Sequence, residues 1–324
     1  MTVPARKTSD SPNARRLSRK KPLRFKPRLP GAMWAGVMED RPLGGRFRAV
    51  RRIVGALVWT MICMPVQLLL LALPGGGRDH FPKLYYRVLC WLIGLKLQVI
   101  GRAGPGAPGA TLYVCNHTSW LDVLALGAIL DARFVAKAEV GTWPLFGWVA
   151  KLGRSVFVSR SRGRTGDEAR ELSGRLRAGQ SLILFPEGTT SDGARVLPFR
   201  SSFFAVAGDA ARVQPLTVVY DRAGGLPAGR RDRPITAWYG DMETASHAWS
   251  LLRRSGTRAT VVLHEAFPPA HLPNRKTMAA AEPPGLAAGR TGASLILTLC
   301  RRIRVANPSF RLLLAVTLLS WNRR

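Results

Sequence analysis

Strand-like and helix-like segments alternate along the middle of this chain, from about residue 97 to about residue 263. The strand candidates are short apolar runs, and the stretches between them carry apolar residues at helical spacing. Such alternation is typical of an α/β domain with a largely parallel or mixed sheet flanked by helices. We expect strands at Leu97–Gly101, Thr111–Cys115, Arg133–Ala136, Ser155–Val158, Ser181–Phe185, Gln214–Tyr220, Ile235–Tyr239 and Ala259–Leu263, and helices at Trp120–Leu130, Trp143–Leu152, Asp167–Ala178, Ser201–Ala210 and Met242–Arg254.

Upstream of this region, residues 53–74 hold no charged side chain. As a helix, the run would extend about 33 Å, enough to cross the hydrocarbon core of a bilayer. A signal peptide would have a shorter apolar core and a much shorter basic region before it, and a core helix of a soluble protein would carry charge. Three glycines, Gly75–Gly77, end the run, and a second apolar stretch follows at Tyr85–Ile100. We therefore expect an N-terminal apolar helical hairpin that anchors the chain to a membrane.

The charge of the chain limits its partners. The sequence holds 49 Lys and Arg against 19 Asp and Glu, a net charge of +30, and residues 1–52 contain 15 of the basic and 3 of the acidic residues. We expect a basic disordered arm there and an anionic partner for the whole chain, such as an anionic membrane surface or an acidic carrier. Zinc-finger spacing and aromatic RNA-binding motifs are missing, so we expect no nucleic acid. The four scattered cysteines indicate a reducing compartment.

A histidine and a carboxylate stand five positions apart, directly after the strand expected at Thr111–Cys115. His117 could take a proton from a hydroxyl, and Asp122 could fix the ring tautomer and stabilise the imidazolium. The alternative is that Ser119 and Asp122 cap a helix while His117 fills a turn. Cys115 lies within the strand, where a nucleophilic role is disfavoured. The sequence lacks a Gly-x-Ser-x-Gly elbow, and a third clustered ligand for a metal is also missing.

A second polar block follows the strand expected at Ser181–Phe185. It reads Phe-Pro-Glu-Gly-Thr-Thr-Ser over residues 185–191. Strand ends of this kind are where α/β sheets usually build their sites, and here backbone amides and the Glu187 carboxylate could meet a polar substrate. The alternative is a turn shaped by Pro186 and Gly188 that leaves Glu187 in solvent.

Together, the two blocks resemble the first and third blocks of the glycerolipid acyltransferase family. The best-known members are the 1-acyl-sn-glycerol-3-phosphate acyltransferases, also called lysophosphatidic acid acyltransferases. Two more segments are similar to the second and fourth blocks, Gly153–Arg160 and Gln214–Leu216. The resemblance covers roughly residues 85–275. One departure is Ser202, which stands where relatives commonly have glycine.

The resemblance implies roles for individual residues. His117 would be the catalytic base and Asp122 would orient it. Substrate would be bound by Lys137, Arg160, Glu187, Gly188, Thr189 and Pro215, with Arg160 on a phosphate, Glu187 on the acceptor head group and Pro215 in the acyl pocket. No metal or redox cofactor is expected, because attack on a thioester requires only a base and a polarised carbonyl.

The implied reaction moves a fatty acyl group from acyl carrier protein or coenzyme A to a membrane lipid acceptor. Our main prediction is acylation of the hydroxyl of 1-acyl-sn-glycerol-3-phosphate to give phosphatidic acid. Residues 134–199 and 237–242 also look like the bacterial branch of lyso-ornithine lipid O-acyltransferases, which is the alternative. The third hypothesis is a non-catalytic basic protein that binds membranes or nucleic acid.

The expected location is the bacterial inner membrane, with the catalytic domain on the cytoplasmic face. The basic residues before residue 53 favour a cytoplasmic N-terminus, so a single span would place the catalytic blocks outside, away from acyl thioesters. A hairpin that enters one leaflet and returns avoids this conflict. The predicted organisation is therefore a basic arm (1–52), a membrane anchor (53–96), a catalytic domain (97–275) and a C-terminal segment of unknown role (276–324).

Overall fold

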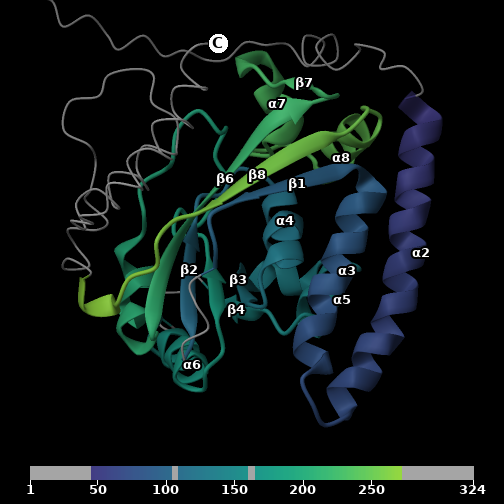
Figure 1. The fold of residues 1–324 in the computed structure, drawn as a ribbon. Coiled ribbons are helices and arrows are strands. Elements are labelled where there is room, and N and C mark those ends of the chain that lie inside the picture. Colours follow the sequence, from purple (N-terminus) through teal and green to yellow (C-terminus); the bar gives the residue numbers. More distant parts are fainter. Residues whose placement is uncertain (1–44, 104–108, 160–164, 272–324) are drawn as a thin grey trace, which may run out of the picture. The chain divides into compact units, whose positions relative to one another are not determined.

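A computed structural model describes residues 45–103, 109–159 and 165–271 of the chain (Figure 1). Most of the predicted basic arm, Arg160, Cys300 and the C-terminal segment 276–324 lie outside the described residues.

The described residues form one mixed sheet of eight strands, in the order β1-β8-β6-β2-β5-β3-β4, with β7 paired to β6. Neighbouring strands are parallel except for the pairs β6–β8 and β6–β7. The mixed α/β fold predicted from the sequence is therefore confirmed. The strands are β1 (Leu95–Ile100), β2 (Thr111–Cys115), β3 (Arg133–Lys137), β4 (Val156–Val158), β5 (Leu182–Leu184), β6 (Arg212–Ala223), β7 (Leu226–Pro227) and β8 (Thr257–Leu263).

The helices around the sheet follow the predicted segments with two exceptions. The expected strand at Ile235–Tyr239 is wrong, because α7 occupies Arg233–Thr236, with Pro234 in its first turn where proline suits a helix. The segment Ser201–Asp209 is a 3₁₀ helix, where an ordinary helix was expected. The remaining α-helices are α2 (Gly45–Ala72), α3 (Gly77–Ile93), α4 (Leu121–Ile129), α5 (Phe146–Leu152), α6 (Thr165–Arg177) and α8 (Thr244–Leu252).

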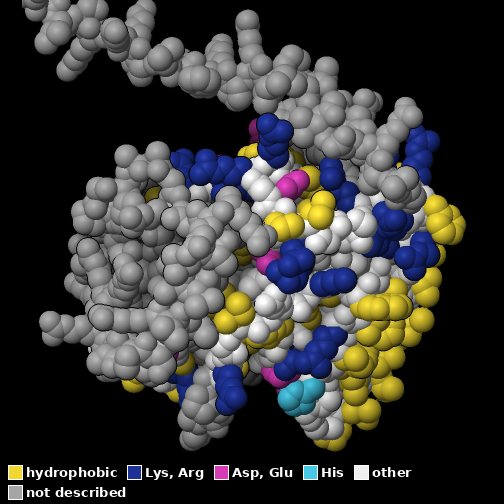
Figure 2. All heavy atoms as spheres, turned by 45° about the horizontal axis from the view of Figure 1, so that its top comes forward, with side chains coloured by type: hydrophobic (Ala, Val, Ile, Leu, Met, Phe, Trp, Pro, Cys, Tyr) yellow, Lys and Arg dark blue, Asp and Glu magenta, His cyan; other side chains and the backbone are white. Residues whose placement is uncertain are grey.

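Helices α2 and α3 form the expected hairpin, joined by a glycine turn (Figure 1). Helix α2 is the one described helix long and apolar enough to cross a membrane. Its buried positions recur every three or four residues along one side and are mostly small or polar. They are Gly45, Ala49, Arg52, Thr60, Cys63 and Gln67. The exposed side is apolar, as the yellow ridge in Figure 2 shows, so the usual amphipathic arrangement of a surface helix is reversed.

Polar contacts hold α2 against the rest of the chain. The Arg52 guanidinium donates to the carbonyls of Leu252 (3.0 Å) and Arg254 (2.7 Å) at the end of α8. Farther along α2, the Gln67 amide donates to the carbonyl of Leu152 in α5 (3.1 Å). Since these bonds direct the polar side of α2 toward the rest of the chain, its apolar side is the one left to face the surroundings.

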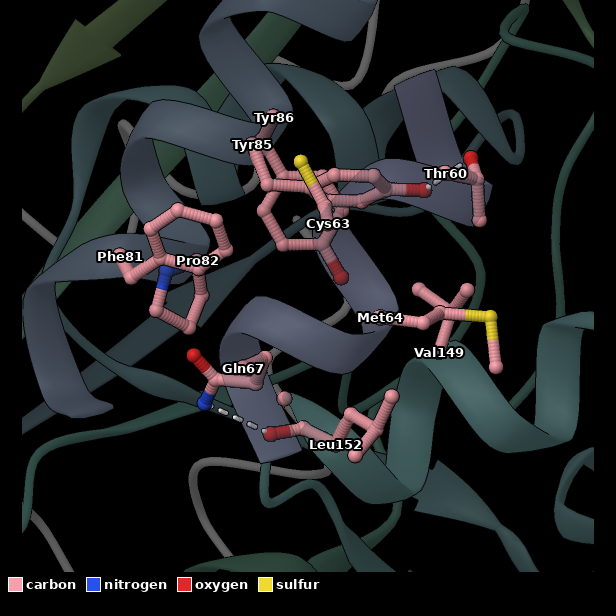
Figure 3. Close-up of a pocket in the computed structure, with 11 residues that line it drawn as sticks. Thr60, Cys63, Met64, Gln67, Phe81, Pro82, Tyr85, Tyr86, Val149 and Leu152 are labelled. Carbon is pink, nitrogen blue, oxygen red and sulfur yellow. Dashed lines mark hydrogen bonds between the residues drawn. The ribbon is translucent and has the colours of Figure 1, made fainter. Parts of the chain in front are cut away.

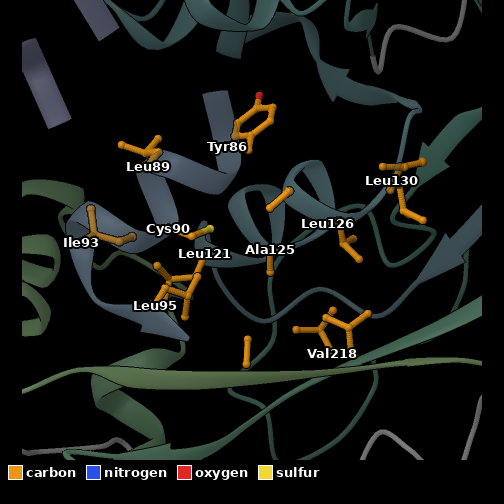
Figure 4. Close-up of a cluster of buried hydrophobic side chains, with 14 of the residues drawn as sticks. Tyr86, Leu89, Cys90, Ile93, Leu95, Leu121, Ala125, Leu126, Leu130 and Val218 are labelled. Atoms are coloured by element: carbon orange, nitrogen blue, oxygen red, sulfur yellow. The ribbon is translucent and has the colours of Figure 1, made fainter. Parts of the chain in front are cut away.

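Helix α3 belongs to the hydrophobic core that also contains α4 and one face of the sheet (Figure 4). Tyr86 packs over Gly127 of α4, where an added Cβ would lie 2.4 Å from the tyrosine ring. Glycine at this position therefore allows the close approach of the two helices. Side chains of strand β2 alternate between two hydrophobic cores. Tyr113 and Cys115 enter this core, whereas Leu112 and Val114 enter a second core between the sheet and α6.

A small cavity of about 30 Å³ lies between α2, α3 and α5 (Figure 3). Its lining includes Cys63, Phe81, Tyr85 and Val149. The cavity is a gap in the packing of these three helices.

Candidate active site

The two predicted catalytic side chains meet where β2 ends and α4 begins. The Nδ1 atom of His117 lies 2.9 Å from Oδ2 of Asp122. Asp122 is completely buried in the first turn of α4, and the His117 side chain is 18% exposed. The sequence spacing thus gives one protected carboxylate and one imidazole that substrate can reach.

Four donors surround the Asp122 carboxylate. Besides the His117 ring, the backbone N–H groups of Thr118 and Ser119 donate to Oδ2 at 2.7 and 2.9 Å. The Tyr220 hydroxyl donates to Oδ1 at 2.5 Å. Burial and the neighbouring Asp122 charge raise the pKa of Tyr220 well above its usual value, which keeps this donor protonated. The network compensates the burial of an anion and leaves Asp122 no freedom to turn.

The orientation of the His117 ring follows from these contacts. Because a carboxylate only accepts hydrogen bonds, Nδ1 carries the proton and Nε2 keeps its lone pair. The ring stacks on Phe185, with centroids 4.0 Å apart and planes 18° apart. Asp122 and Phe185 therefore fix both the tautomer and the plane of the base, with Nε2 available to remove a proton from a hydroxyl.

Glu187 is 3% exposed and bonded to the backbone. Its Oε1 accepts the N–H of His117 (2.7 Å), and its Oε2 accepts the N–H of Leu197 (2.8 Å). The resemblance implied a contact between this carboxylate and the acceptor head group. In the structure, the carboxylate joins the loop after β5 to the backbone of His117, so Glu187 helps to position the histidine. Its contact with an acceptor head group stays a prediction.

Burial raises the pKa of Glu187 to about 7, against the opposing effect of its two backbone hydrogen bonds. Since this pKa exceeds the ordinary value of 4.5, the folded state binds the proton more tightly than the unfolded state. Protonation of Glu187 therefore contributes to the free energy of unfolding. This contribution is complete below pH 4.5 and decreases by at most about 3 kcal/mol as the pH rises to about 7. We expect the free energy of unfolding to fall less over this range in Glu187→Gln than in the wild type.

Chemical denaturation in a non-ionic detergent at several pH values measures this difference, and other titrating groups cancel between the two proteins. Equal pH slopes for wild type and variant would contradict the raised pKa.

Gly188 follows with a φ of 67°, in the left-handed region. A Cβ at this position would lie 2.9 Å from Nε of Arg200, so the tight turn favours glycine. Thr189, the next residue, is exposed at the surface of the site. Both predicted substrate-binding positions therefore stand on the loop that Glu187 fixes.

The other predicted positions are more dispersed. Pro215 is buried inside β6, level with Val114 of β2. Lys137 ends β3 at the same edge of the sheet and forms an exposed ion pair with Glu139 at 2.7 Å. Arg160 lies outside the described residues. The substrate-binding roles of Lys137, Gly188, Thr189 and Pro215 stay predictions.

Sequence reasoning missed three residues that build the site. Tyr220 contacts Asp122 from β6, 98 positions away. The Asn116 side chain forms two hydrogen bonds with the backbone of Val218 (2.9 and 3.1 Å), which ties the end of β2 to β6. The backbone N–H of Trp238 donates to the carbonyl of Thr118 (2.8 Å). An asparagine directly after a strand was a usable signal for Asn116, whereas Tyr220 and Trp238 required the fold.

Cys115 offers no competing nucleophile. It is completely buried, and burial together with the charges of Asp122 and Glu187 raises its pKa well above the usual value for a thiol. A thiol in this state is not ionised near neutral pH. The geometry suits a base-assisted attack by a hydroxyl of a substrate.

The chain is similar to known acyltransferases. The sequence profile of the Acyltransferase family matches residues 98–221. A lyso-ornithine lipid O-acyltransferase of Brucella abortus (strain 2308) is 38% identical over 218 residues, which cover 64% of this chain and 81% of the relative. A 1-acyl-sn-glycerol-3-phosphate acyltransferase of Neisseria gonorrhoeae is 34% identical over 163 residues, 49% of this chain and 60% of the relative.

Among solved structures, the 1-acyl-sn-glycerophosphate (LPA) acyltransferase PlsC from Thermotoga maritima has the same fold, with a TM-score of 0.52. It is 18% identical, and the match covers 81% of this chain and 94% of PlsC.

The fold and the histidine–aspartate site define an enzyme that transfers acyl groups. The chain belongs to the acyltransferase family. Within that family, its relatives place it among the enzymes that acylate lysophospholipids and related lysolipids.

Proposed function

We propose that this protein is a lyso-ornithine lipid O-acyltransferase, which esterifies the hydroxyl of a lyso-aminolipid with a fatty acyl group from acyl carrier protein or coenzyme A. The observation that carries the proposal is the extent of similarity to the Brucella enzyme, 81% of which is covered at 38% identity. The Neisseria enzyme is covered over 60% at 34% identity. Because the match covers more of the lyso-ornithine lipid enzyme, we favour lyso-ornithine lipid as the acceptor over 1-acyl-sn-glycerol-3-phosphate, which was our main prediction from the sequence.

In the proposed reaction, the acceptor hydroxyl lies against Nε2 of His117. The nitrogen removes the hydroxyl proton as the oxygen attacks the thioester carbonyl, and a tetrahedral intermediate forms. Collapse of this intermediate breaks the carbon–sulfur bond, and the imidazolium returns the proton to the departing thiolate. The products are the ester and a free thiol. Asp122 stabilises the imidazolium during both proton transfers.

Acylation of 1-acyl-sn-glycerol-3-phosphate remains the second candidate, because the Neisseria relative carries that name. A thiol-release assay with the purified full chain distinguishes the two acceptors. Acyl thioester is supplied with either lyso-ornithine lipid or lysophosphatidic acid. We expect kcat/KM for lyso-ornithine lipid to be at least about tenfold higher, equivalent to about 1.4 kcal/mol of transition-state stabilisation. The reverse preference would overturn the acceptor, and no release with either lipid would overturn the activity.

The apolar side of α2 supports attachment of the enzyme to the membrane, with the catalytic domain on the cytoplasmic face where acyl thioesters are found. The exposed residues of this side include Leu57, Met61, Ile62, Leu68 and Leu69. Insertion of such a side chain into lipid contributes about 1.5–3 kcal/mol when it leaves water completely.

We therefore expect the double variant Ile62→Asp/Leu69→Asp to lose most of its carbonate-resistant membrane association while it keeps its fold. The two positions are 54% and 61% exposed, so the new carboxylates do not enter the protein core. Sedimentation with membranes measures the effect. The control is Leu226→Asp on β7, an equally apolar position that is 72% exposed. If the double variant sediments like the control, α2 is not the attachment surface.

A further inference from the structure

A polar cavity of about 370 Å³ lies at the edge of the sheet opposite the active site. It is bordered by the first turn of α3, the start of β3, the end of α5 and the turn before β5. His117 and Glu187 follow the carboxyl ends of β2 and β5, whereas Arg133 in this cavity is the first residue of β3. The cavity is therefore separate from the catalytic centre, and it has room for a phosphate group and several waters.

Cationic side chains outnumber carboxylates in the cavity lining. Arg78, Lys83, Arg133 and Arg154 face two aspartates. Lys83 is paired with Asp131 at 2.6 Å. The other aspartate, Asp79, is shared by three arginines, as described next. Two positive charges are left without a counterion from the lining itself.

The side chains of all three arginines approach the carboxylate of Asp79. Nη2 of Arg133 and Nη1 of Arg154 both donate to Oδ1 of Asp79 at 2.7 Å, and Nε of Arg78 lies 3.9 Å from Oδ2. Nη1 of Arg133 and Nε of Arg78 are buried and have no hydrogen-bond partner among the residues that the structure describes. The Arg133 side chain is only 11% exposed. A buried guanidinium N–H without an acceptor is costly. Both guanidinium groups border the cavity, where an anion would offset the excess positive charge of the lining.

The backbone at Arg154 gives an independent indication. Its φ is 57°, in the left-handed region where glycine is favoured, and α5 ends at this point. An arginine in this conformation costs of order 1 kcal/mol relative to glycine. The strained position holds the guanidinium beside Asp79 at the cavity. Strain of this kind persists where the side chain has a task that glycine cannot perform.

We propose that this cavity is a binding site for a phosphate group, held by Arg78, Arg133 and Arg154. The forked guanidinium groups of Arg133 and Arg154 suit the oxygens of a phosphate, and each keeps donors beyond those used by Asp79. The phosphate belongs to a lipid head group or is free in solution. Because the cavity is separate from His117, the site is independent of which lipid the enzyme acylates.

Two variants test the proposal. Arg154→Gly removes one guanidinium and relieves the positive-φ conformation, so its melting temperature without phosphate should be no more than a few degrees from that of the wild type. Arg133→Gln removes the buried guanidinium. The matched control is Arg170→Gln on α6, whose side chain is 81% exposed and lies outside the cavity.

Thermal unfolding of the full chain in a non-ionic detergent is measured against increasing inorganic phosphate, with chloride at equal ionic strength as the reference. We expect a saturable rise in melting temperature for wild type and Arg170→Gln, and an apparent affinity at least about tenfold lower for Arg154→Gly and Arg133→Gln. No saturable rise in the wild type, or the same rise in all four proteins, would overturn the site and leave an arginine cluster that only stabilises the fold.

A second titration identifies the source of the phosphate. Short-chain, water-soluble phosphatidic acid replaces inorganic phosphate in the same four proteins. If it acts at a much lower concentration and depends on Arg154, the ligand is a lipid head group. Equal potency of the two compounds, again dependent on Arg154, indicates free phosphate. A response to phosphatidic acid that is unchanged in Arg154→Gly comes from elsewhere in the enzyme and counts against a lipid ligand in this cavity.

Discussion

Replacement of His117 with alanine is expected to lower kcat/KM for acyl transfer by about 10²- to 10⁴-fold, the usual contribution of a positioned general base. His117 is held by Asp122 at 2.9 Å and stacks on Phe185, so its Nε2 is presented in one orientation. Alanine removes the proton acceptor and leaves the backbone bond to Glu187 in place. The residual rate comes from binding and orientation of the two substrates.

Thiol release from the acyl donor measures the loss, and the melting temperature shows whether the fold persists. His80→Ala is the matched control, because this histidine side chain is 73% exposed. The control should keep wild-type activity. If His117→Ala keeps more than about a tenth of the wild-type kcat/KM, another group removes the hydroxyl proton, and the proposed mechanism fails.

Much of the site could be predicted from the sequence, because its central pair is local. His117 and Asp122 lie within one strand–helix junction, and a short apolar strand followed by the polar run Asn116–Asp122 predicts both the junction and the pair. The sheet was predictable for a similar reason, since most of its strands are short apolar runs. The segment at Ile235–Tyr239 has the same apolar character, but Pro234 in a first helical turn outweighed it.

Contacts between segments that are distant in the sequence could not be predicted. Glu187 is spaced 70 residues from His117, and whether it faces solvent or the histidine backbone depends on how the loop after β5 folds. The contact of Tyr220 with Asp122 could not be predicted for the same reason.

The role of α3 in the hairpin was also not predictable. Its apolar residues suggest a membrane anchor, yet Leu89 and Cys90 pack in the core with α4. Hydrophobicity alone cannot distinguish a lipid-facing side chain from one that packs against another helix.

The second large effect is expected for Asp122→Asn, with a loss of about 10²-fold in kcat/KM. Asparagine keeps the shape of the carboxylate. Its oxygen can accept from His117 Nδ1 and from the N–H groups of Thr118 and Ser119, while its amide donates to the Tyr220 hydroxyl, which turns to accept. The ring tautomer is therefore retained. What asparagine lacks is the negative charge that stabilises the imidazolium, so the loss should be smaller than for His117→Ala.

Tyr220→Phe separates the charge of Asp122 from its positioning. This change removes one of the four donors to the carboxylate and keeps the charge, so we expect a decrease of about tenfold or less. The double variant Asp122→Asn/Tyr220→Phe should then be no worse than Asp122→Asn alone, because the tyrosine acts through the carboxylate. If the decrease in kcat/KM of the double variant is the product of the decreases in the two single variants, Tyr220 contributes to catalysis independently of Asp122. If Asp122→Asn alone retains wild-type kcat/KM, the aspartate only caps α4, and His117 works without a charged partner.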